Sequence, residues 1–346
     1  MHVPDFDIST NSSNRSQRIF QFTIIILSIL LGLLCLAGFI VTSIKWNLSP
    51  DLINECQNDT QPIVLCYIRL IINNNLLTQW DRYIMISLLF TYATVFFHII
   101  VESTRTNVSG LLGQMIIQTI FIIAGIGVCF PILFIPSYIY FYKSENKLNK
   151  SPVPIHILYT GLIYIVLIII TPTYLIYFLS SNKLIISIMS IILLISPLGF
   201  ALISLPVRLF SESIQRCWII NSHRLIVYCQ IILFILSAPL FFITFVSLIM
   251  HWSNELIKKS YVNEISNMIN PITIIWSIDY ISLFIGLILY LITNEYLLID
   301  SIYLNRSSKI KRLIGCFIFA VIFIISPCLA FPLYIAWKEY QFVELI

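Results

Sequence analysis

Long apolar runs separated by short polar connections make up most of this chain. One of the clearest reads 83-YIMISLLFTYATVFFHIIVE-102, and a run of about 18 or more apolar residues is long enough to cross a bilayer. Because every backbone group inside a bilayer needs a hydrogen-bond partner, helices are the expected form. The pattern predicts an all-α transmembrane bundle of about eight spans, near 19–44, 82–102, 114–142, 155–179, 184–206, 225–250, 272–298 and 313–337.

The predicted organisation is a single transmembrane domain with short polar ends. A polar tail covers residues 1–18, the helical domain covers 19–339, and a carboxyl tail covers 340–346. The long connection 45–81 contains 63-IVLCYIRLII-72, which is too short to span a bilayer and is interrupted by an arginine. We expect an interfacial or re-entrant helix there.

Prolines and one very short connection shape the predicted spans. Prolines lie inside five spans, and each should kink its helix because it removes a backbone hydrogen bond. The fourth and fifth spans are joined only by SSNK, which predicts a tight helical hairpin. No internal repeat is evident in the sequence, which weakens the interpretation as a transporter built from inverted repeats.

The composition agrees with a membrane protein. The chain is 59% hydrophobic and 10% charged, with a mean hydropathy of +0.94, whereas soluble domains are about 45–50% apolar. The net charge of +4 is spread over short connections, so we expect the lipid bilayer as a partner and no nucleic acid. Of the eight cysteines, only Cys56 and Cys66 share a connection, and whether they pair depends on the face that it lies on.

The Lys and Arg residues divide unevenly between the two faces if all eight spans cross. Thirteen of the 20 fall in the odd-numbered connections, and seven fall in the tails and even-numbered connections. The positive-inside rule then predicts both termini on the lumenal or extracellular side. A glycoprotein modified at Asn11 or Asn14 is expected, with the sequons at Asn47, Asn58 and Asn305 in the cytosol.

Ionisable residues gather at the end of the second predicted span, where residues 98–106 read HIIVESTRT. His98, Glu102 and Arg105 fall on one face of a helix, at positions i, i+4 and i+7. In the predicted topology Asp279 lies about two turns inside the seventh span, roughly 10 Å below the boundary and at similar depth. Since buried carboxylates are costly in lipid, we expect His98, Glu102 and Asp279 to face one pocket.

Structural explanations for these residues stay open at this point. Glu102 and Arg105 are also what a surface pair at a helix end looks like, and His98 is also typical of a packed histidine. Asp279 has no basic neighbour in its own helix, which favours either a functional role or an interhelical hydrogen bond. Glu295 is expected at a solvated interface near the other end of that helix.

Common catalytic and metal-binding motifs are missing from the sequence. It contains no HExxH, no CxxC pair, no GxSxG and no phosphate-binding glycine loop, so we expect no cofactor and no metal site. The triplet 81-DRY-83 invites comparison with serpentine receptors, but it opens the second span and does not end the third. That family is therefore disfavoured.

One ordered set of motifs is shared with a known family. It consists of E-x-x-R at Glu102 and Arg105, then 125-GIGVCFPILFIPSYIYF-141, 151-SPVPIH-156 and 323-FIISPCLAFPLYIAWKE-339. This pattern resembles a fungal family of eight-span integral membrane proteins, of which some act as terpene cyclases in meroterpenoid pathways. The resemblance implies a metal-free cyclase or isomerase that acts on an isoprenoid lipid.

The resemblance also implies roles for particular residues. Asp279 would protonate an epoxide or alkene, Glu102 would be a second acid or a hydrogen-bond partner, and Arg105 would orient Glu102. Aromatic faces would stabilise a carbocation; the candidates are Trp276, Tyr280, Phe134, Tyr138 and Tyr140. The expected location is the endoplasmic reticulum or another endomembrane, with the plasma membrane as the alternative. The competing hypothesis is a non-catalytic receptor or carrier for a lipophilic ligand.

Overall fold

The structure, a computed structural model, is helical throughout the residues that it describes. These are 8–45, 78–105, 111–144, 153–179, 182–211, 222–258, 271–302 and 306–345. They are 96% helix and contain no strand. Five helices are long and apolar enough to cross a membrane, or six if the bent pair Leu184–Leu193 and Ser196–Ser204 is one span. The predicted all-α bundle is confirmed, whereas eight single spans are more than these helices provide. The predicted helix 63–72 and the pair Cys56 and Cys66 lie outside the described residues.

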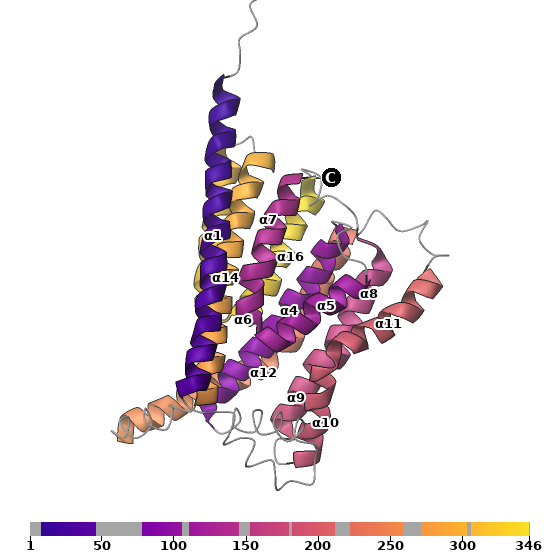
Figure 1. Ribbon diagram of the computed structural model, residues 1–346, viewed down its shortest axis with the longest axis vertical. Helices are drawn as coiled ribbons and strands as arrows, with labels where there is room; N and C mark the ends of the chain where they lie inside the picture. Colours follow the sequence, from indigo (N-terminus) through magenta and orange to yellow (C-terminus); the bar gives the residue numbers. More distant parts are fainter. Residues whose placement is uncertain are drawn as a thin grey trace, which may run out of the picture.

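Figure 1 shows the helices as one bundle, with α1 along one edge beside α14 and with α4 near the centre. The described elements are α1 (Ile8–Lys45), α4 (Gln79–Arg105), α5 (Leu111–Ala124), α6 (Ile126–Cys129), the π-helix η1 (Phe130–Phe134), α7 (Ile135–Ser144), α8 (Ile155–Ile165), the π-helix η3 (Val166–Ile170), α9 (Thr171–Phe178), α10 (Lys183–Leu194), α11 (Ser196–Ser211), α12 (Ser222–Lys258), α14 (Pro271–Ile302), α15 (Arg306–Ile325) and α16 (Pro327–Leu345). Helix α1 begins at Ile8, well inside the polar tail predicted for residues 1–18.

Helices α4 and α14 run parallel to each other, side by side. The Thr273 hydroxyl donates to Asp81 Oδ1 at 2.5 Å near the start of both helices. Near the other end, His98 Nε2 and the Tyr290 hydroxyl lie 2.7 Å apart. The spacing between partners is 192 residues in both pairs, so the two helices keep the same direction and register. This arrangement contradicts the predicted topology, in which the second and seventh spans run in opposite directions.

The segment 111–144 folds back on itself at Gly125. This glycine has φ 87° and ψ 146°, a conformation that other residues rarely adopt. Beyond it, the Cys129 thiol lies 3.5 Å from the carbonyl oxygen of Ile120, although nine residues of straight helix would separate them by about 13 Å. The single span predicted at 114–142 is therefore wrong. Helix α5 leads down to the turn, and α6, η1 and α7 lead back.

Prolines explain the local geometry of the returning limb. Pro131 has no N–H, so it cannot bond the carbonyl of Gly127 four residues earlier. The Ser282 hydroxyl of α14 donates to that free carbonyl oxygen at 2.6 Å. The chain forms the π-helix η1 (Phe130–Phe134) around Pro131 and just before Pro136. The kinks expected from proline appear here as a π-helical segment, and a neighbouring helix bonds the carbonyl of Gly127 just before it.

The carboxyl-terminal segment forms a second hairpin, with its break at Ser326. Helices α15 and α16 pack antiparallel, because Phe319 lies against Trp337 with ring centroids 5.4 Å apart and Phe323 lies 6.4 Å from Phe331. The single span predicted at 313–337 is also wrong. Each hairpin follows one of the parallel helices α4 and α14, so the chain contains the same order of elements twice.

The tight hairpin predicted between the fourth and fifth spans is confirmed. Helix α9 ends at Phe178 and α10 begins at Lys183, where the Asn182 side chain caps the helix by accepting from the backbone N–H groups of Leu184 and Ile185. Helices α10 and α11 are bent by 64° at their junction. This bend places Ser196, the first residue of α11, inside the bundle.

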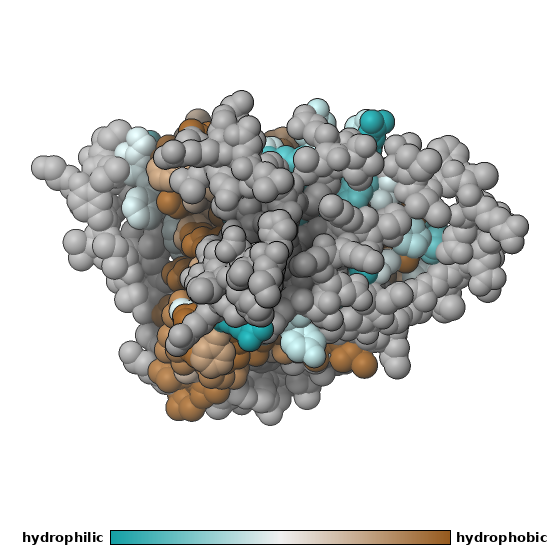
Figure 2. All heavy atoms as spheres, turned by 90° about the horizontal axis from the view of Figure 1, so that it is seen from above, coloured by the Kyte–Doolittle hydropathy of each residue, from teal (hydrophilic) through white to brown (hydrophobic). Residues whose placement is uncertain are grey.

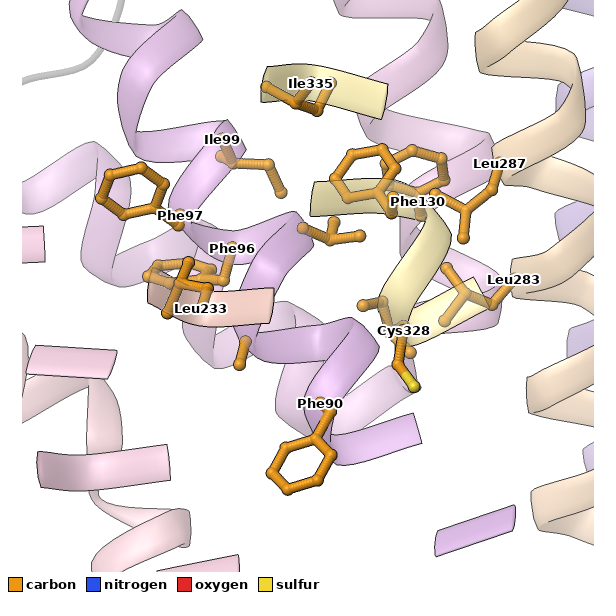
Figure 3. Packing of buried hydrophobic residues seen from close by; sticks show 14 of the residues in the cluster. Phe90, Phe96, Phe97, Ile99, Phe130, Leu233, Leu283, Leu287, Cys328 and Ile335 are labelled. Atoms are coloured by element: carbon orange, nitrogen blue, oxygen red, sulfur yellow. The ribbon is translucent and has the colours of Figure 1, made fainter. Parts of the chain in front are cut away.

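The centre of the bundle is filled by apolar side chains from different helices. Figure 3 shows Phe90, Phe96 and Phe97 of α4 on one side of α16, with Leu283 and Leu287 of α14 on the other. Apolar residues also cover the outside: Leu34 of α1 is 71% exposed. Seen from above in Figure 2, the described hydrophobic residues form a band along one flank. Such an exterior suits lipid and not water.

Candidate functional site

A cluster of buried charges joins the ends of α4, α12 and α16. Arg105 donates two hydrogen bonds to the Glu339 carboxylate, from Nη1 at 2.8 Å and from Nη2 at 2.6 Å. The same Nη1 donates to Glu102 Oε1 at 3.0 Å. The bidentate contact between Arg105 and Glu339 is the strongest geometry available to a guanidinium and a carboxylate. The Glu102–Arg105 pair is present as expected, but it is buried, with Arg105 only 6% exposed.

Two further residues extend this charge cluster. His223, at the start of α12, places Nδ1 2.7 Å from Glu339 Oε2. The Lys338 ammonium lies 3.7 Å from Glu102 Oε1 and donates to the Tyr138 hydroxyl at 3.3 Å. The cluster therefore contains two carboxyl groups, a guanidinium and a lysine amino group, with a histidine beside them. Charges taken out of water are tolerated only when they are paired in this way.

A chain of neutral groups continues from the charge cluster into α14. The Tyr138 hydroxyl donates to Asn294 Oδ1 at 2.7 Å, and the Asn294 amide donates to the Tyr334 hydroxyl. Tyr334 in turn donates to Glu295 Oε1 at 2.8 Å. The prediction that Glu295 is solvated is therefore wrong, because it is buried and accepts a hydrogen bond from α16. Helices α4, α7, α12, α14 and α16 are all tied together at this level.

His98 lies one turn deeper than Glu102, within a group of aromatic rings. Its ring is 5.6 Å from that of Phe331 and 5.9 Å from that of Phe134, both edge-on, and Nε2 contacts the Tyr290 hydroxyl. Its Nε2 is 3.9 Å from Glu102 Oε1. This surrounding is apolar on most sides, so His98 connects the charge cluster to the aromatic core.

Asp279 lies elsewhere, where it caps the returning limb of the first hairpin. Its Oδ1 accepts from the backbone N–H of Gly127 at 2.8 Å, at the amino-terminal end of α6. A carboxylate is favourable there because the first N–H groups of a helix have no partner inside it. A Cβ on Gly125 would lie 2.7 Å from the same oxygen, and one on Gly127 would lie 2.2 Å from the Asp279 carbonyl oxygen. The two glycines allow this close approach.

The predicted pocket shared by His98, Glu102 and Asp279 is wrong. Asp279 precedes Tyr290, the partner of His98, by 11 residues on α14, which corresponds to roughly 16 Å along a helix. Glu102 lies a turn farther in the same direction. The physical reason is that the hairpin at 111–144 does not cross as a span, so α4 and α14 run parallel and their equivalent ends meet.

The predicted aromatic lining is divided in the same way. Phe134 and Tyr138 stand beside Tyr290 and His98, with Tyr138 and Tyr290 ring centroids 5.1 Å apart. Tyr280 lies in the other half of the bundle, 6.5 Å from Tyr83, and Trp276 lies one turn before it on α14. Tyr140 is 68% exposed. The five residues therefore do not line a common site.

Sequence reasoning missed the residues that complete the charge cluster, namely His223, Tyr290, Asn294, Tyr334, Lys338 and Glu339. One signal was present: Lys338 and Glu339 directly follow the apolar run of α16. Adjacent opposite charges at the end of such a run also suit a solvated helix end. Their burial depends on the hairpin, which carries α16 back to the level of Glu102.

Family models, curated proteins and solved structures were compared with the chain, and none of them matched. Among the described residues, no group of three or more His, Cys, Asp or Glu side chains is placed to hold a metal ion. The fold and the site define a class: a multi-pass helical membrane protein with a paired, buried charge cluster near one end of the bundle.

Proposed function

We propose that the chain is a non-catalytic membrane protein that binds a lipophilic ligand as a receptor or carrier. This proposal is based on the observation that the buried carboxyl groups near the candidate site are already bonded to other groups of the protein. Glu102 and Glu339 are ion-paired with Arg105, and Asp279 caps a helix. Such pairing suits groups that hold a bundle together around a binding site, whereas general acid catalysis needs an acid within reach of a substrate.

The test is the lipid content of the purified full-length chain. A receptor or carrier for a lipophilic ligand should retain one neutral lipid species at a ratio well above that of the surrounding membrane, measured by mass spectrometry after purification in detergent. The matched control is an unrelated multi-pass protein from the same membranes. Lipid ratios equal to those of the bulk membrane for both proteins would refute the binding proposal.

A second candidate is the metal-free cyclase that acts on an isoprenoid lipid. It is favoured by the aromatic rings around His98, one turn from Glu102, because such faces suit a carbocation. The test is to incubate membranes that contain the protein with prenylated epoxides and to search for cyclised products. Turnover that is lost in Glu102→Gln but kept in Asp279→Asn would place the acid in the charge cluster and would replace the binding proposal.

For the topology, we propose six crossings and two re-entrant hairpins. Helices α1, α4, α8–α9, α10–α11, α12 and α14 would cross, while the hairpins 111–144 and 306–345 would enter and leave at the same face. Non-helical turns at membrane depth are tolerated when protein surrounds them, and the turn at Gly125 lies against Asp279 and Phe39. Six crossings would bring both termini to one face. This is supported by Figure 1, where the start of α1 and the carboxyl end lie toward the same end of the bundle.

This topology reverses the expected orientation. Fourteen of the 20 Lys and Arg residues then belong to the face with the termini, and the opposite face has the other six, which are Lys45, Arg69, Arg82, Lys183, Lys258 and Lys259. The positive-inside rule places the richer face in the cytosol. Both termini are therefore proposed to be cytosolic, and the connection between α1 and α4 to be lumenal or extracellular.

Glycosylation tests this orientation directly. In a eukaryotic host we expect a glycosidase-sensitive shift in mobility that disappears when Asn47 and Asn58 are both replaced by Gln, because both sequons lie in the connection between α1 and α4. The control Asn305→Gln should keep the shift, since that sequon is on the terminal face. A shift that disappears only when Asn11 and Asn14 are both replaced would restore the orientation expected from eight spans.

A further inference from the structure

A second polar cluster lies within the apolar layer, where four helices meet. It consists of Tyr92 of α4, Gln118 of α5, Tyr164 of α8 and Ser196 of α11. The Tyr164 hydroxyl donates to Gln118 Oε1 at 3.2 Å. The Ser196 hydroxyl lies near both tyrosine hydroxyl groups. These elements are far apart in the sequence and are brought together by the first hairpin and the bend before α11.

Several atoms of this cluster have unused hydrogen-bonding capacity. Among the described residues, the buried Gln118 Nε2 atom has no hydrogen-bond partner, and the Tyr92 and Ser196 hydroxyl groups lie near each other without forming a hydrogen bond of full geometry. The Gln118 side chain is fully buried. A buried polar group without a partner typically costs about 1–3 kcal/mol. The donors of Gln118 and the two hydroxyl groups therefore suit a small polar group that both accepts and donates.

Aromatic rings pack beside this cluster, and two of its residues have exposed apolar neighbours in the sequence. The Phe96 and Phe200 rings lie 5.9 Å and 5.2 Å from the Tyr164 ring. Ile163, next to Tyr164, is 46% exposed, and Ile195, next to Ser196, is 47% exposed. On two of the four elements, an exposed residue is therefore the sequence neighbour of a cluster residue that is itself buried.

The break between α10 and α11 forms part of the cluster. Ile195 ends α10 with φ −87° and ψ 9°, and the two helices bend by 64° at this point. Ile195, at this junction, is 47% exposed. The junction is therefore the point at which a chain from the lipid phase would reach the cluster.

We propose that the cluster of Tyr92, Gln118, Tyr164 and Ser196 binds the hydroxyl group of a neutral, long-chain lipid that enters from the bilayer. This inference rests on the proposed binding function and names its ligand class. Tyr and Ser hydroxyl groups and an amide are neutral under ordinary conditions, and no side chain of the cluster carries a charge to match a carboxylate or an amine. A buried charge without a partner is far more costly than a hydroxyl.

The experiment uses photolabelling of the full-length protein in detergent micelles. The probe is hexadecanol that carries a diazirine near its hydroxyl end, and the comparison probe is the corresponding diazirine alkane without the hydroxyl. We expect the alcohol to label peptides of α5, α8 or α11 several-fold more than the alkane does. In Gln118→Leu this labelling should fall by about tenfold, the equivalent of one buried hydrogen bond of ~1.4 kcal/mol.

Gln230→Leu provides a matched control. Gln230 lies on α12, is also fully buried, and its amide oxygen and nitrogen also have no partner among the described residues. Its replacement should leave the labelling unchanged. Tyr164→Phe should reduce labelling without loss of fold, because the ring and its contacts with Phe96 and Phe200 are retained.

Two results would overturn this assignment. Equal labelling by alcohol and alkane would mean that the cluster holds only water or is closed to lipid. An equal response of Gln118→Leu and Gln230→Leu would mean that the hydroxyl binds elsewhere. If the purified protein still retains one enriched lipid in either case, the binding function stands and only the site fails. If no lipid is enriched, both proposals fail.

Discussion

Arg105→Ala is expected to destabilise the protein by about 3–5 kcal/mol, because it leaves buried carboxylates without their cation. Arg105 is the partner of both Glu339 and Glu102. Its removal would leave the two carboxylates at the junction of α4 and α16 with only Lys338, 3.7 Å from Glu102 Oε1, and His223, 2.7 Å from Glu339 Oε2. Neither carboxylate can turn to water at this depth, since the side chains of Glu339 and Glu102 are 0% and 4% exposed.

This expectation differs from the one that the sequence alone supports. A residue at the end of an apolar run can extend its guanidinium into water, and its loss is then mild. The structure places the Arg105 guanidinium inside the bundle, held by three hydrogen bonds to carboxylates. Thermal unfolding in detergent, followed by tryptophan fluorescence, measures the difference.

Matched variants make this measurement specific. Arg18→Ala removes an exposed arginine of α1 and should leave the melting temperature almost unchanged. Arg105→Lys should be intermediate, because a lysine keeps the charge but cannot form the bidentate contact. Adding Glu339→Gln to Arg105→Ala should recover part of the loss, since it removes one unpaired charge. If Arg105→Ala melts at the same temperature as Arg18→Ala, the charge cluster contributes nothing to stability.

The class of fold could be predicted from the sequence because the length and hydropathy of each apolar run indicate a helix surrounded by lipid or by other helices. Runs of α1, α4, α12 and α14 are long and uninterrupted, and all four were located within a few residues of their apolar cores. Hydropathy does not indicate in which direction a helix runs, or whether the chain crosses the bilayer or turns back. A run such as 114–142 has the length of a span whether it crosses the bilayer or folds back, and only the positive φ of Gly125 distinguishes the two.

That one ambiguity accounts for the mistaken part of the candidate site. With 111–144 counted as a crossing, α14 is inverted and Asp279 is placed beside Glu102. The local pattern remained informative: the spacing of His98, Glu102 and Arg105 correctly put them on one face of α4, and the structure adds partners from α12, α14 and α16. Contacts between helices depend on how many segments cross the bilayer and in which order. The sequence of a single apolar run does not contain this information.

The 125-GIG-127 stretch and Asp279 illustrate how a motif can be noticed and its role misread. The glycines belong to the motif that suggested a terpene cyclase, and Asp279 was the expected proton donor. In the structure the carboxylate and the glycines meet, and together they close the turn of the first hairpin. The presence of a buried carboxyl group at Asp279 is explained by the backbone N–H of Gly127 that it accepts from.

Asp279→Leu should therefore destabilise the first hairpin, by about 1–3 kcal/mol for the unpaired N–H of Gly127 alone. Asp279→Asn should retain near-normal stability, because its amide oxygen can still accept from that N–H. A proton donor would give a different result, since Asp279→Asn would then abolish activity and both variants would fold. The melting temperatures of the two variants, measured with lipid retention, separate these roles.

Gly127→Ala tests the same contact from the other side and is expected to have the larger effect. Its Cβ would lie 2.2 Å from the carbonyl oxygen of Asp279, which is backbone and cannot rotate away. Gly199→Ala is the control: its Cβ would meet the nearest atom, of the Ile168 side chain, at an ordinary 3.5 Å, and an alanine favours a helix by about 1 kcal/mol over glycine. We expect Gly127→Ala to lower the melting temperature and Gly199→Ala to preserve or raise it. Equal melting temperatures for Asp279→Leu, Gly127→Ala and the unmodified protein would show that α6 and α14 do not approach each other closely, and the re-entrant hairpin would have to be abandoned.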